Sequence, residues 1–215
     1  MICVAISEKS LEKCLSILDH VEMAEIRLDL TGFDLDAIRK VFVHPTPAIA
    51  TCRPEKFSEK DQLKKLQVAI ESGARYVDIE IDAAIKQQQA IIEIARKHDC
   101  KVIISYHNFE KTPGFQELNK IMTDCYDHGA DIAKLVTLSC STSDNARILS
   151  LYNTNKPLVA LCMGDAGKVT RIMAPLLGAE FTFASMDNFN ATASGQISYS
   201  RMKTILSILQ KELRS

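Results

Sequence analysis

The sequence predicts an α/β fold, a single (β/α)8 barrel, on three observations. Short runs rich in β-branched residues alternate with helical patterns, and eight such pairs follow one another along the chain. Strict alternation of strand and helix is typical of a parallel sheet. The chain has 215 residues, and eight units in a chain of this size most simply close into one barrel. An open, doubly wound sheet is the alternative that the pattern leaves open.

The eight expected strands are short and evenly spaced. They cover residues 2–6, 24–30, 48–52, 76–82, 101–107, 131–137, 157–163 and 181–185. Apolar residues at helical spacing follow four of them, in segments 11–18, 63–70, 84–95 and 202–209. Weaker patterns predict helices near 34–42 and 165–177. Ser58 provides a start signal and Gly73 a stop signal for the helix that contains 63–70, and Gly129 provides a stop signal for another helix.

The composition is that of an ordinary globular protein. It is 47% hydrophobic and 25% charged, and the formal net charge of −1 gives no reason to expect a nucleic-acid partner. No apolar run approaches the ~18 residues of a membrane span. Residues 1–7 lack a basic segment followed by a long apolar one, so we expect no secretory signal and a cytoplasmic location. We expect one catalytic domain over residues 1–215, with no second domain.

Seven cysteines are scattered along the chain, and none forms a CxxC pair. This spacing argues against a disulfide framework and against a zinc site. We expect the cysteines to be reduced residues that contribute to packing.

Charged side chains recur at every second position of several expected strands. Since alternate residues of a strand point to opposite faces, one set faces the helices and the other faces the barrel interior. The alternative is a half-exposed sheet with a wet face, but intervening helices favour a parallel sheet that is covered on both sides. Buried charges are costly unless they are paired or used, so we predict a polar catalytic pocket at the carboxyl ends of the strands. The predicted interior set is Glu25, Arg27, Arg53, Glu80, His107 and Lys134.

Lys134 is the most unusual member of this set, because lysine is seldom buried within an apolar strand. In a low-dielectric, partly cationic site, its pKa is expected to fall, and a neutral amine attacks carbonyls to form an imine. Alternatively, Lys134 reaches solvent or pairs with a buried carboxylate such as Glu80. His107, at the end of the neighbouring strand, is suited to acid–base work near neutral pH. The alternative is a hydrogen-bonded strand-end histidine with no role in catalysis.

Six segments, in order along the chain, resemble motifs of the type I 3-dehydroquinate dehydratase family. Ser105–Pro113 resembles the family's histidine motif, and Asp131–Lys134 resembles its Schiff-base lysine motif. The other four similar segments are Glu25–Arg27, Thr51–Arg53, Met163–Arg171 and Ala193–Gln196. Each match alone is weak, but six in register with eight βα units are specific.

The resemblance implies a chemistry and a set of roles. Lys134 forms an imine with the C3 ketone of 3-dehydroquinate, and His107 removes the C2 proton and protonates the departing C1 hydroxyl. The resemblance also implies that the reaction is a syn elimination, the third step of the shikimate pathway, with no metal or organic cofactor. By the same resemblance, the protein is expected to be a homodimer. The implied substrate-binding residues are Glu25, Arg27 and Arg53 for hydroxyls, Arg171 for the carboxylate, and Thr192 and Gln196 in the closing loop.

The chain departs from the family pattern at several positions. Residues 54–57 replace a Glu-Gly-Gly stretch, so no role is assigned to Glu55, and Ser194 replaces a loop proline. Two alternatives also remain: a different Schiff-base barrel such as a class I aldolase, and a non-catalytic barrel that binds a small carboxylate through Arg171. The first would need a phosphate-binding loop, and no glycine-rich one follows strands seven and eight.

Overall fold

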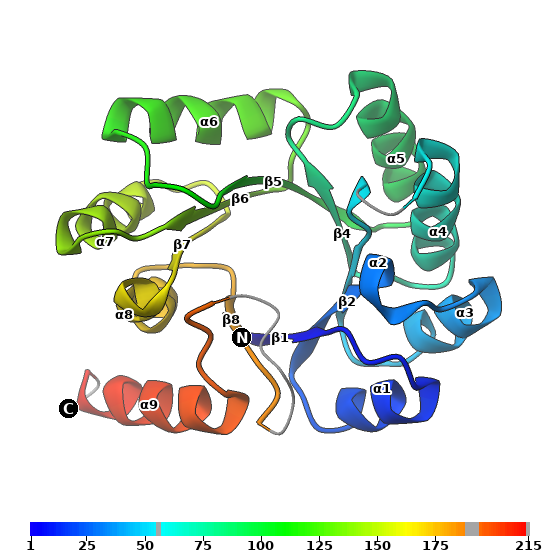
Figure 1. Ribbon diagram of the computed structural model, residues 1–215, viewed down its shortest axis with the longest axis horizontal. Helices are drawn as coiled ribbons and strands as arrows, with labels where there is room; N and C mark the ends of the chain where they lie inside the picture. Colours follow the sequence, from blue (N-terminus) through cyan, green and yellow to red (C-terminus); the bar gives the residue numbers. More distant parts are fainter. Residues whose placement is uncertain (55–56, 188–193, 214–215) are drawn as a thin grey trace.

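The strand–helix alternation produces a barrel in the computed structural model, which describes residues 1–54, 57–187 and 194–213. All strand pairs are parallel, in the order β7-β6-β5-β4-β3-β2-β1-β8. The strands form a ring with helices outside it (Figure 1). This confirms the predicted (β/α)8 barrel and excludes the open doubly wound sheet. The strands are β1 (Ile2–Ile6), β2 (Met23–Arg27), β3 (Ala48–Thr51), β4 (Tyr76–Glu80), β5 (Lys101–Asn108), β6 (Ile132–Leu138), β7 (Leu158–Met163) and β8 (Thr182–Ala184).

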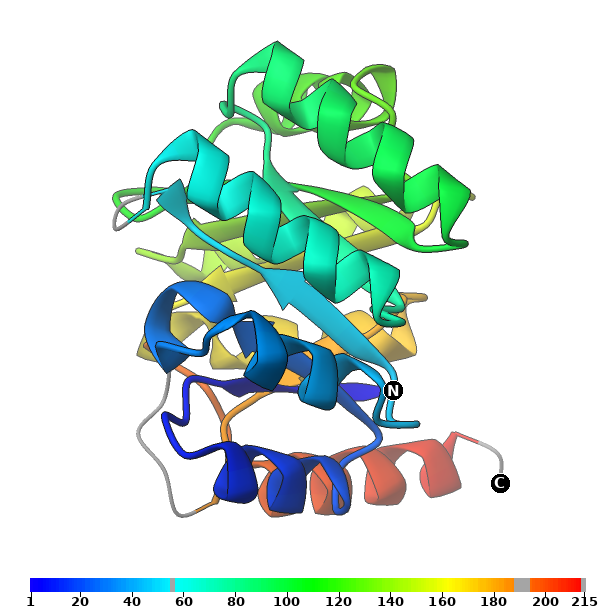
Figure 2. The same ribbon diagram turned by 90° about the vertical axis from the view of Figure 1, so that its right-hand side faces the viewer.

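The ring is nearly closed. Within the described residues, no ladder of hydrogen bonds joins β7 to β8, which has only three residues. Beside this gap, Glu180 N donates to Leu158 O at 3.1 Å. Figure 2 shows the helices packed along the outside of the strands. The helices are α1 (Leu11–Leu18), α2 (Leu28–Thr31), α3 (Leu35–Phe42), α4 (Glu59–Glu71), α5 (Ile85–Lys97), α6 (Phe115–Asp127), α7 (Thr142–Leu149), α8 (Lys168–Met173) and α9 (Tyr199–Glu212), with 3₁₀ turns η2 (Ser150–Tyr152), η3 (Asp165–Gly167) and η4 (Ala174–Leu176).

One strand prediction was wrong. The alternation of Ile26, Leu28 and Leu30 suggested a strand through residue 30, but the chain turns into helix α2 after Arg27. Leu28 is fully buried in this short helix, which ends at Gly32 with φ +74°. An apolar pair two residues apart is compatible with either structure, so periodicity alone misplaced the boundary.

Two apolar cores hold the barrel. The larger lies between the outward strand faces and the helices and includes Ile26, Val77, Ile104 and Leu135. The smaller lies in the barrel interior. Its members Leu161 and Phe183 line a pocket at the carboxyl ends of the strands, whereas Cys3, Met23 and Ile49 form a floor at the amino-terminal ends. There Tyr76 and Phe181 meet edge to face, with ring centroids 5.9 Å apart. This apolar floor leaves the polar side chains of the interior at the carboxyl ends of the strands.

Helix ends agree with their local sequence. The Ser58 hydroxyl accepts from Asp61 N at the start of α4, and Gly73 and Gly129 adopt φ +111° and +97° just after α4 and α6. None of the described helices is long and apolar enough to cross a membrane. All seven cysteines are free thiols, and only Cys140 among them is exposed, which agrees with the expected packing role.

Candidate active site

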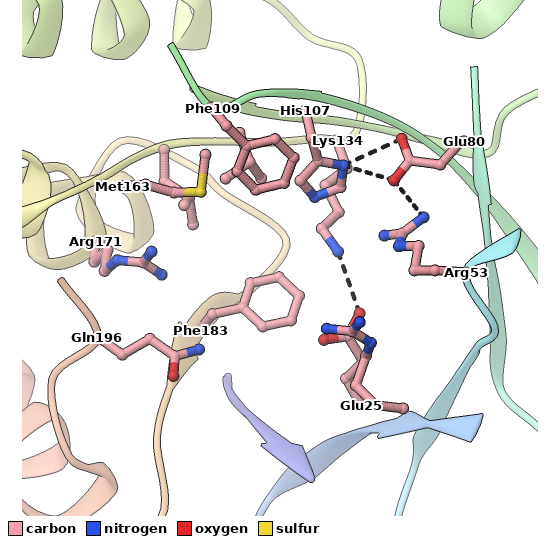
Figure 3. Close-up of a pocket in the computed structure, with 13 residues that line it drawn as sticks. Glu25, Arg53, Glu80, His107, Phe109, Lys134, Met163, Arg171, Phe183 and Gln196 are labelled. Carbon is pink, nitrogen blue, oxygen red and sulfur yellow. Dashed lines mark hydrogen bonds and ion pairs between the residues drawn. The ribbon is translucent and has the colours of Figure 1, made fainter. Parts of the chain in front are cut away.

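The interior side chains lie in layers, because successive inward positions of each strand are two residues apart. Above the apolar floor lie Glu25, Asp78, Ser105 and Lys134, all buried. The next layer, nearer the mouth, carries the remaining charged groups. One pocket is lined by Glu25, Arg27, Arg53, Glu80, His107, Phe109, Lys134, Val136, Leu161, Met163, Arg171, Phe183 and Gln196 (Figure 3). All six residues of the predicted interior set therefore share one pocket, together with Arg171 and Gln196.

Lys134 lies at the centre of the barrel and is 3% exposed. Its ammonium nitrogen is 2.8 Å from Asp78 Oδ2 and 3.3 Å from Glu25 Oε1. The ring centroid of Phe183 lies 4.6 Å from the same nitrogen. Lys134 therefore pairs with buried carboxylates, as the second of the two alternatives from sequence predicted. Its partners are Glu25 and Asp78 rather than Glu80.

The expectation that the pKa of Lys134 falls is wrong. Burial favours the neutral amine, but the carboxylates of Asp78 and Glu25 outweigh it and raise the pKa of Lys134 above its usual value. The lysine also holds the pKa of Glu25 below its ordinary range against the effect of burial. The two carboxylates beside it therefore favour the charged, ammonium form of this side chain.

His107 and Arg53 meet at Glu80 near the pocket mouth. His107 Nδ1 lies 2.9 Å from Glu80 Oε1, and Arg53 Nη1 lies 2.6 Å from the same oxygen (Figure 3). A histidine that donates from Nδ1 to a carboxylate has Nε2 left to accept a proton. Glu80 thus fixes the histidine ring in a tautomer suited to a general base. The ring of Phe109 stacks on His107, with centroids 6.0 Å apart.

Arg27 is held by the turn that follows β2. Its Nε and Nη2 donate to the two carboxylate oxygens of Asp29, at 3.0 and 2.7 Å. Asp29 lies in helix α2 and not on the inward face of a longer strand. From there its carboxylate holds the Arg27 guanidinium against the pocket wall through two parallel hydrogen bonds.

Arg171 is the most deeply buried cation of the site, at 1% exposure. Within the described residues it makes no ion pair, and its Nε has no hydrogen-bond partner. Burial accordingly lowers the pKa of Arg171 to about 10. A buried guanidinium without a counter-ion, in a pocket with other polar groups, is a binding site for an anion such as a carboxylate.

The turn after β7 fixes the position of Arg171. Thr170 Oγ1 accepts from Cys162 N at 2.8 Å and donates to Gly167 O at 2.6 Å. A side chain at Gly167 would come within 2.7 Å of Cys162 Cβ. Glycine therefore lets helix α8 begin directly against the strand, and the Thr170 hydroxyl ties the two together.

The last βα loop docks on the same turn. Gly164 N donates to Ser194 O at 3.3 Å, and Gly195, at φ +76°, would place an added Cβ 2.2 Å from Gly164 O. This contact positions the following Gln196 over the pocket (Figure 3). Thr192, also predicted to bind substrate, lies outside the described residues, as does Glu55.

Asp78 is the main site residue that the sequence did not single out. Motif spacing gave no signal for it, although its alternation with Ile79 placed it on the inward face of β4. Phe109, Met163 and Phe183, the apolar lining, were likewise not assigned. No group of three or more histidine, cysteine, aspartate or glutamate side chains placed to hold a metal ion occurs among the described residues.

Comparison with known proteins identifies the relatives of this chain. The sequence profile of the family described as type I 3-dehydroquinase matches residues 2–212. A 3-dehydroquinate dehydratase from Desulfotalea psychrophila is 32% identical, over 95% of this chain and 96% of the relative. One from Methanococcus vannielii is 33% identical, over 98% of this chain and all (100%) of the relative.

Solved structures are similar in fold. The type I 3-dehydroquinate dehydratase of Clostridium difficile superposes with a TM-score of 0.86 at 22% identity, covering 98% of this chain and 92% of that one. The 3-dehydroquinate dehydratase of Geobacillus kaustophilus gives a TM-score of 0.86 at 24% identity, covering 98% and 91%.

Proposed function

The chain belongs to the type I 3-dehydroquinase family and is a hydro-lyase of that family, and we propose that it dehydrates 3-dehydroquinate through an imine on Lys134. The observation that carries this proposal is the joint burial, in one pocket, of a lysine and of an arginine that has no counter-ion among the described residues. The reaction is the third step of the shikimate pathway, which leads to the aromatic amino acids.

The substrate is a cyclic hydroxy acid with one ketone and one carboxylate, and the pocket offers a complement to each. Lys134 meets the C3 ketone, and the Arg171 guanidinium binds the carboxylate. Glu25, Arg27 and Arg53 each keep hydrogen-bonding atoms that their ion pairs do not use, and these atoms bind the hydroxyl groups of the substrate. Thr192 and Gln196 close over the substrate from the last βα loop.

The imine is the electron sink of the reaction. A positive nitrogen conjugated to C3 makes the C2 proton acidic, and His107 Nε2 removes it. The same imidazole then protonates the C1 hydroxyl, which leaves as water in a syn elimination. Hydrolysis of the imine releases 3-dehydroshikimate and restores Lys134. Glu80 stabilises the imidazolium that forms between the two proton transfers.

Three further properties are proposed together. The barrel is a single catalytic domain over residues 1–215, the protein acts in the cytoplasm, and it forms a homodimer. The first rests on the family match across residues 2–212, and the other two rest on the family resemblance alone.

Turnover tests the function directly. Addition of 3-dehydroquinate should produce the ultraviolet absorbance of a conjugated enone, and this turnover should persist in excess EDTA, because the imine supplies the electron sink. A ligand-induced rise in melting temperature without turnover would identify the chain as a non-catalytic carboxylate-binding barrel. Cleavage of a carbon–carbon bond would instead support the aldolase alternative.

Replacement of Arg171 by lysine should be far from conservative. Lysine offers a point charge where a planar fork can bind both oxygens of a carboxylate. We expect a loss of about 2–3 kcal/mol in apparent substrate binding, a rise in KM of roughly 30- to 150-fold. Steady-state kinetics measures this, with Arg39→Lys, at an exposed surface pair, as the control. An unchanged KM would place the carboxylate elsewhere.

A further inference from the structure

We propose that Asp78 is a positioning residue of the imine reaction: it holds a positive charge on the Lys134 nitrogen both before and after the imine forms. This inference rests on the proposed function, since it concerns the same lysine. It explains why a site that needs a nucleophilic amine contains a carboxylate beneath that amine.

Asp78 is rigidly held and does not face the pocket. Its side chain is 0% exposed, and it does not line the pocket that holds Lys134. Oδ2 contacts the lysine nitrogen at 2.8 Å, while Oδ1 is 3.0 Å from Arg53 Nη1 and accepts from Ser105 Oγ at 2.7 Å. With one oxygen fixed by a cation and a hydroxyl, the other stays directed at the lysine.

Glu25 is the second carboxylate near the lysine, but it is less closely engaged. Its Oε1 is 3.3 Å from the nitrogen and also accepts from Thr51 Oγ1 at 2.9 Å. Glu25 lines the pocket, so it is available to substrate hydroxyls. Asp78 is therefore the permanent counter-ion, and Glu25 is the one that exchanges partners when substrate binds.

The charge on the nitrogen is the same at the start and the end of imine formation. The ammonium of Lys134 loses two of its three hydrogens, and the ketone oxygen leaves with both as water. A carbon–nitrogen double bond replaces the carbon–oxygen one, and the protonated imine retains one hydrogen and one positive charge. A fixed anion beside the nitrogen stabilises both cations, so the site needs no rearrangement of charge during the reaction.

The same anion has opposite effects on the two chemical steps. It opposes formation of the neutral amine, and thus slows attack on a carbonyl. It also keeps the imine protonated, and only the protonated imine is a strong electron sink for removal of the C2 proton. Loss of the anion should therefore make the amine more reactive and the enzyme slower, a combination that general disruption of the fold would not produce.

Other titratable groups surround the lysine and remain when Asp78 is changed. They come from β1, β2, the turn after β3, β4, β5 and α8. These groups are Cys3, Glu25, Arg27, Arg53, Glu80, His107 and Arg171. Among the described carboxylates, only Asp78 approaches the lysine nitrogen within 3 Å.

The test is Asp78→Asn, studied by acetylation and by turnover. Acetic anhydride is applied over a range of pH, and modification of Lys134 is quantified by peptide mass spectrometry. We expect the midpoint pH of acetylation to fall by about one unit, so that modification at a fixed lower pH rises about ten-fold. Turnover of 3-dehydroquinate should fall, in kcat more than in KM, because Asp78 does not touch the substrate. Asp144→Asn removes another buried carboxylate, on α7, and should leave both measurements unchanged.

Two results would overturn the proposal. One is an unchanged acetylation midpoint in Asp78→Asn, and the other is normal turnover in that variant. If the variant does not fold, the wild-type protein decides: the acetylation midpoint of Lys134 must lie above that of exposed lysines, and a lower midpoint rejects the proposal. In each case, a borohydride-trapped adduct on wild-type Lys134 would show that the imine mechanism still holds.

Discussion

Lys134→Ala should abolish both turnover and the covalent adduct that borohydride traps in the presence of substrate. The amine is the group that forms the bond to the substrate, and no other lysine lines the pocket within the described residues. Removal of a covalent nucleophile costs turnover on the order of 10⁶-fold. Mass spectrometry of the wild-type protein should place the adduct on the peptide that contains Lys134. An adduct on another peptide, or inactivation without one, would contradict the central mechanism.

This substitution should also destabilise the protein. Lys134 is a counter-ion of two buried carboxylates, so its loss leaves negative charge in the barrel interior with only partial compensation from Arg53. Breaking a buried ion pair from one side costs about 3–5 kcal/mol. Loss of activity in the alanine variant therefore has two sources, the missing amine and the weakened fold.

Lys134→Arg separates the two effects. A guanidinium keeps the positive charge beside Asp78 and Glu25, but it does not become neutral in proteins and forms no imine. We expect it to melt closer to the wild-type temperature than the alanine variant does, while both variants lack turnover and adduct. Substantial turnover in the arginine variant would show that the lysine acts through its charge rather than through a covalent bond.

One physical reason allowed both the barrel and most of the charged residues that line its pocket to be predicted from the sequence. Alternation along a strand assigns each residue to a face, and the expensive burial of charge marks the inward face as functional. Glu25, Glu80, His107 and Lys134 were all found in this way and share one pocket. The same rule did not fix where β2 ends, because Leu28 fits an inward or outward apolar position in a strand and a buried position in a helix equally well.

Pairing within the pocket was not predictable from sequence. Asp78 and Lys134 are 56 residues apart, and whether a lysine meets Asp78 or Glu80 depends on which layer of the barrel each side chain occupies. The direction of the pKa shift of Lys134 depends on this pairing. Burial and the neighbouring Arg53 lower the pKa of Lys134, and a carboxylate at hydrogen-bond distance raises it. A charge pattern therefore indicates that a site exists, while its electrostatics depends on contacts of about 3 Å.

His107→Ala should separate bond formation from proton transfer. The Lys134 amine and the substrate ketone both remain in this variant, so the imine should still form. Without a positioned base at C2, elimination should slow by about 10²–10⁴-fold, and by more if the imidazole serves in several transfers. The covalent species should therefore accumulate and be visible by mass spectrometry after mixing with substrate, even without borohydride.

The histidine's partners sharpen this expectation. Glu80 holds Nδ1 at 2.9 Å and also contacts Arg53, so removal of the ring leaves Glu80 paired and the pocket charge balanced. The variant should then fold normally, which a thermal melt would check. His128→Ala is the matched control, because this histidine caps α6 and contacts Gln88, away from the pocket lining. It should retain full turnover. Near-normal turnover in His107→Ala would remove His107 from the mechanism and make Glu80 the next candidate base, because Glu80 is the carboxylate that remains at that edge of the pocket.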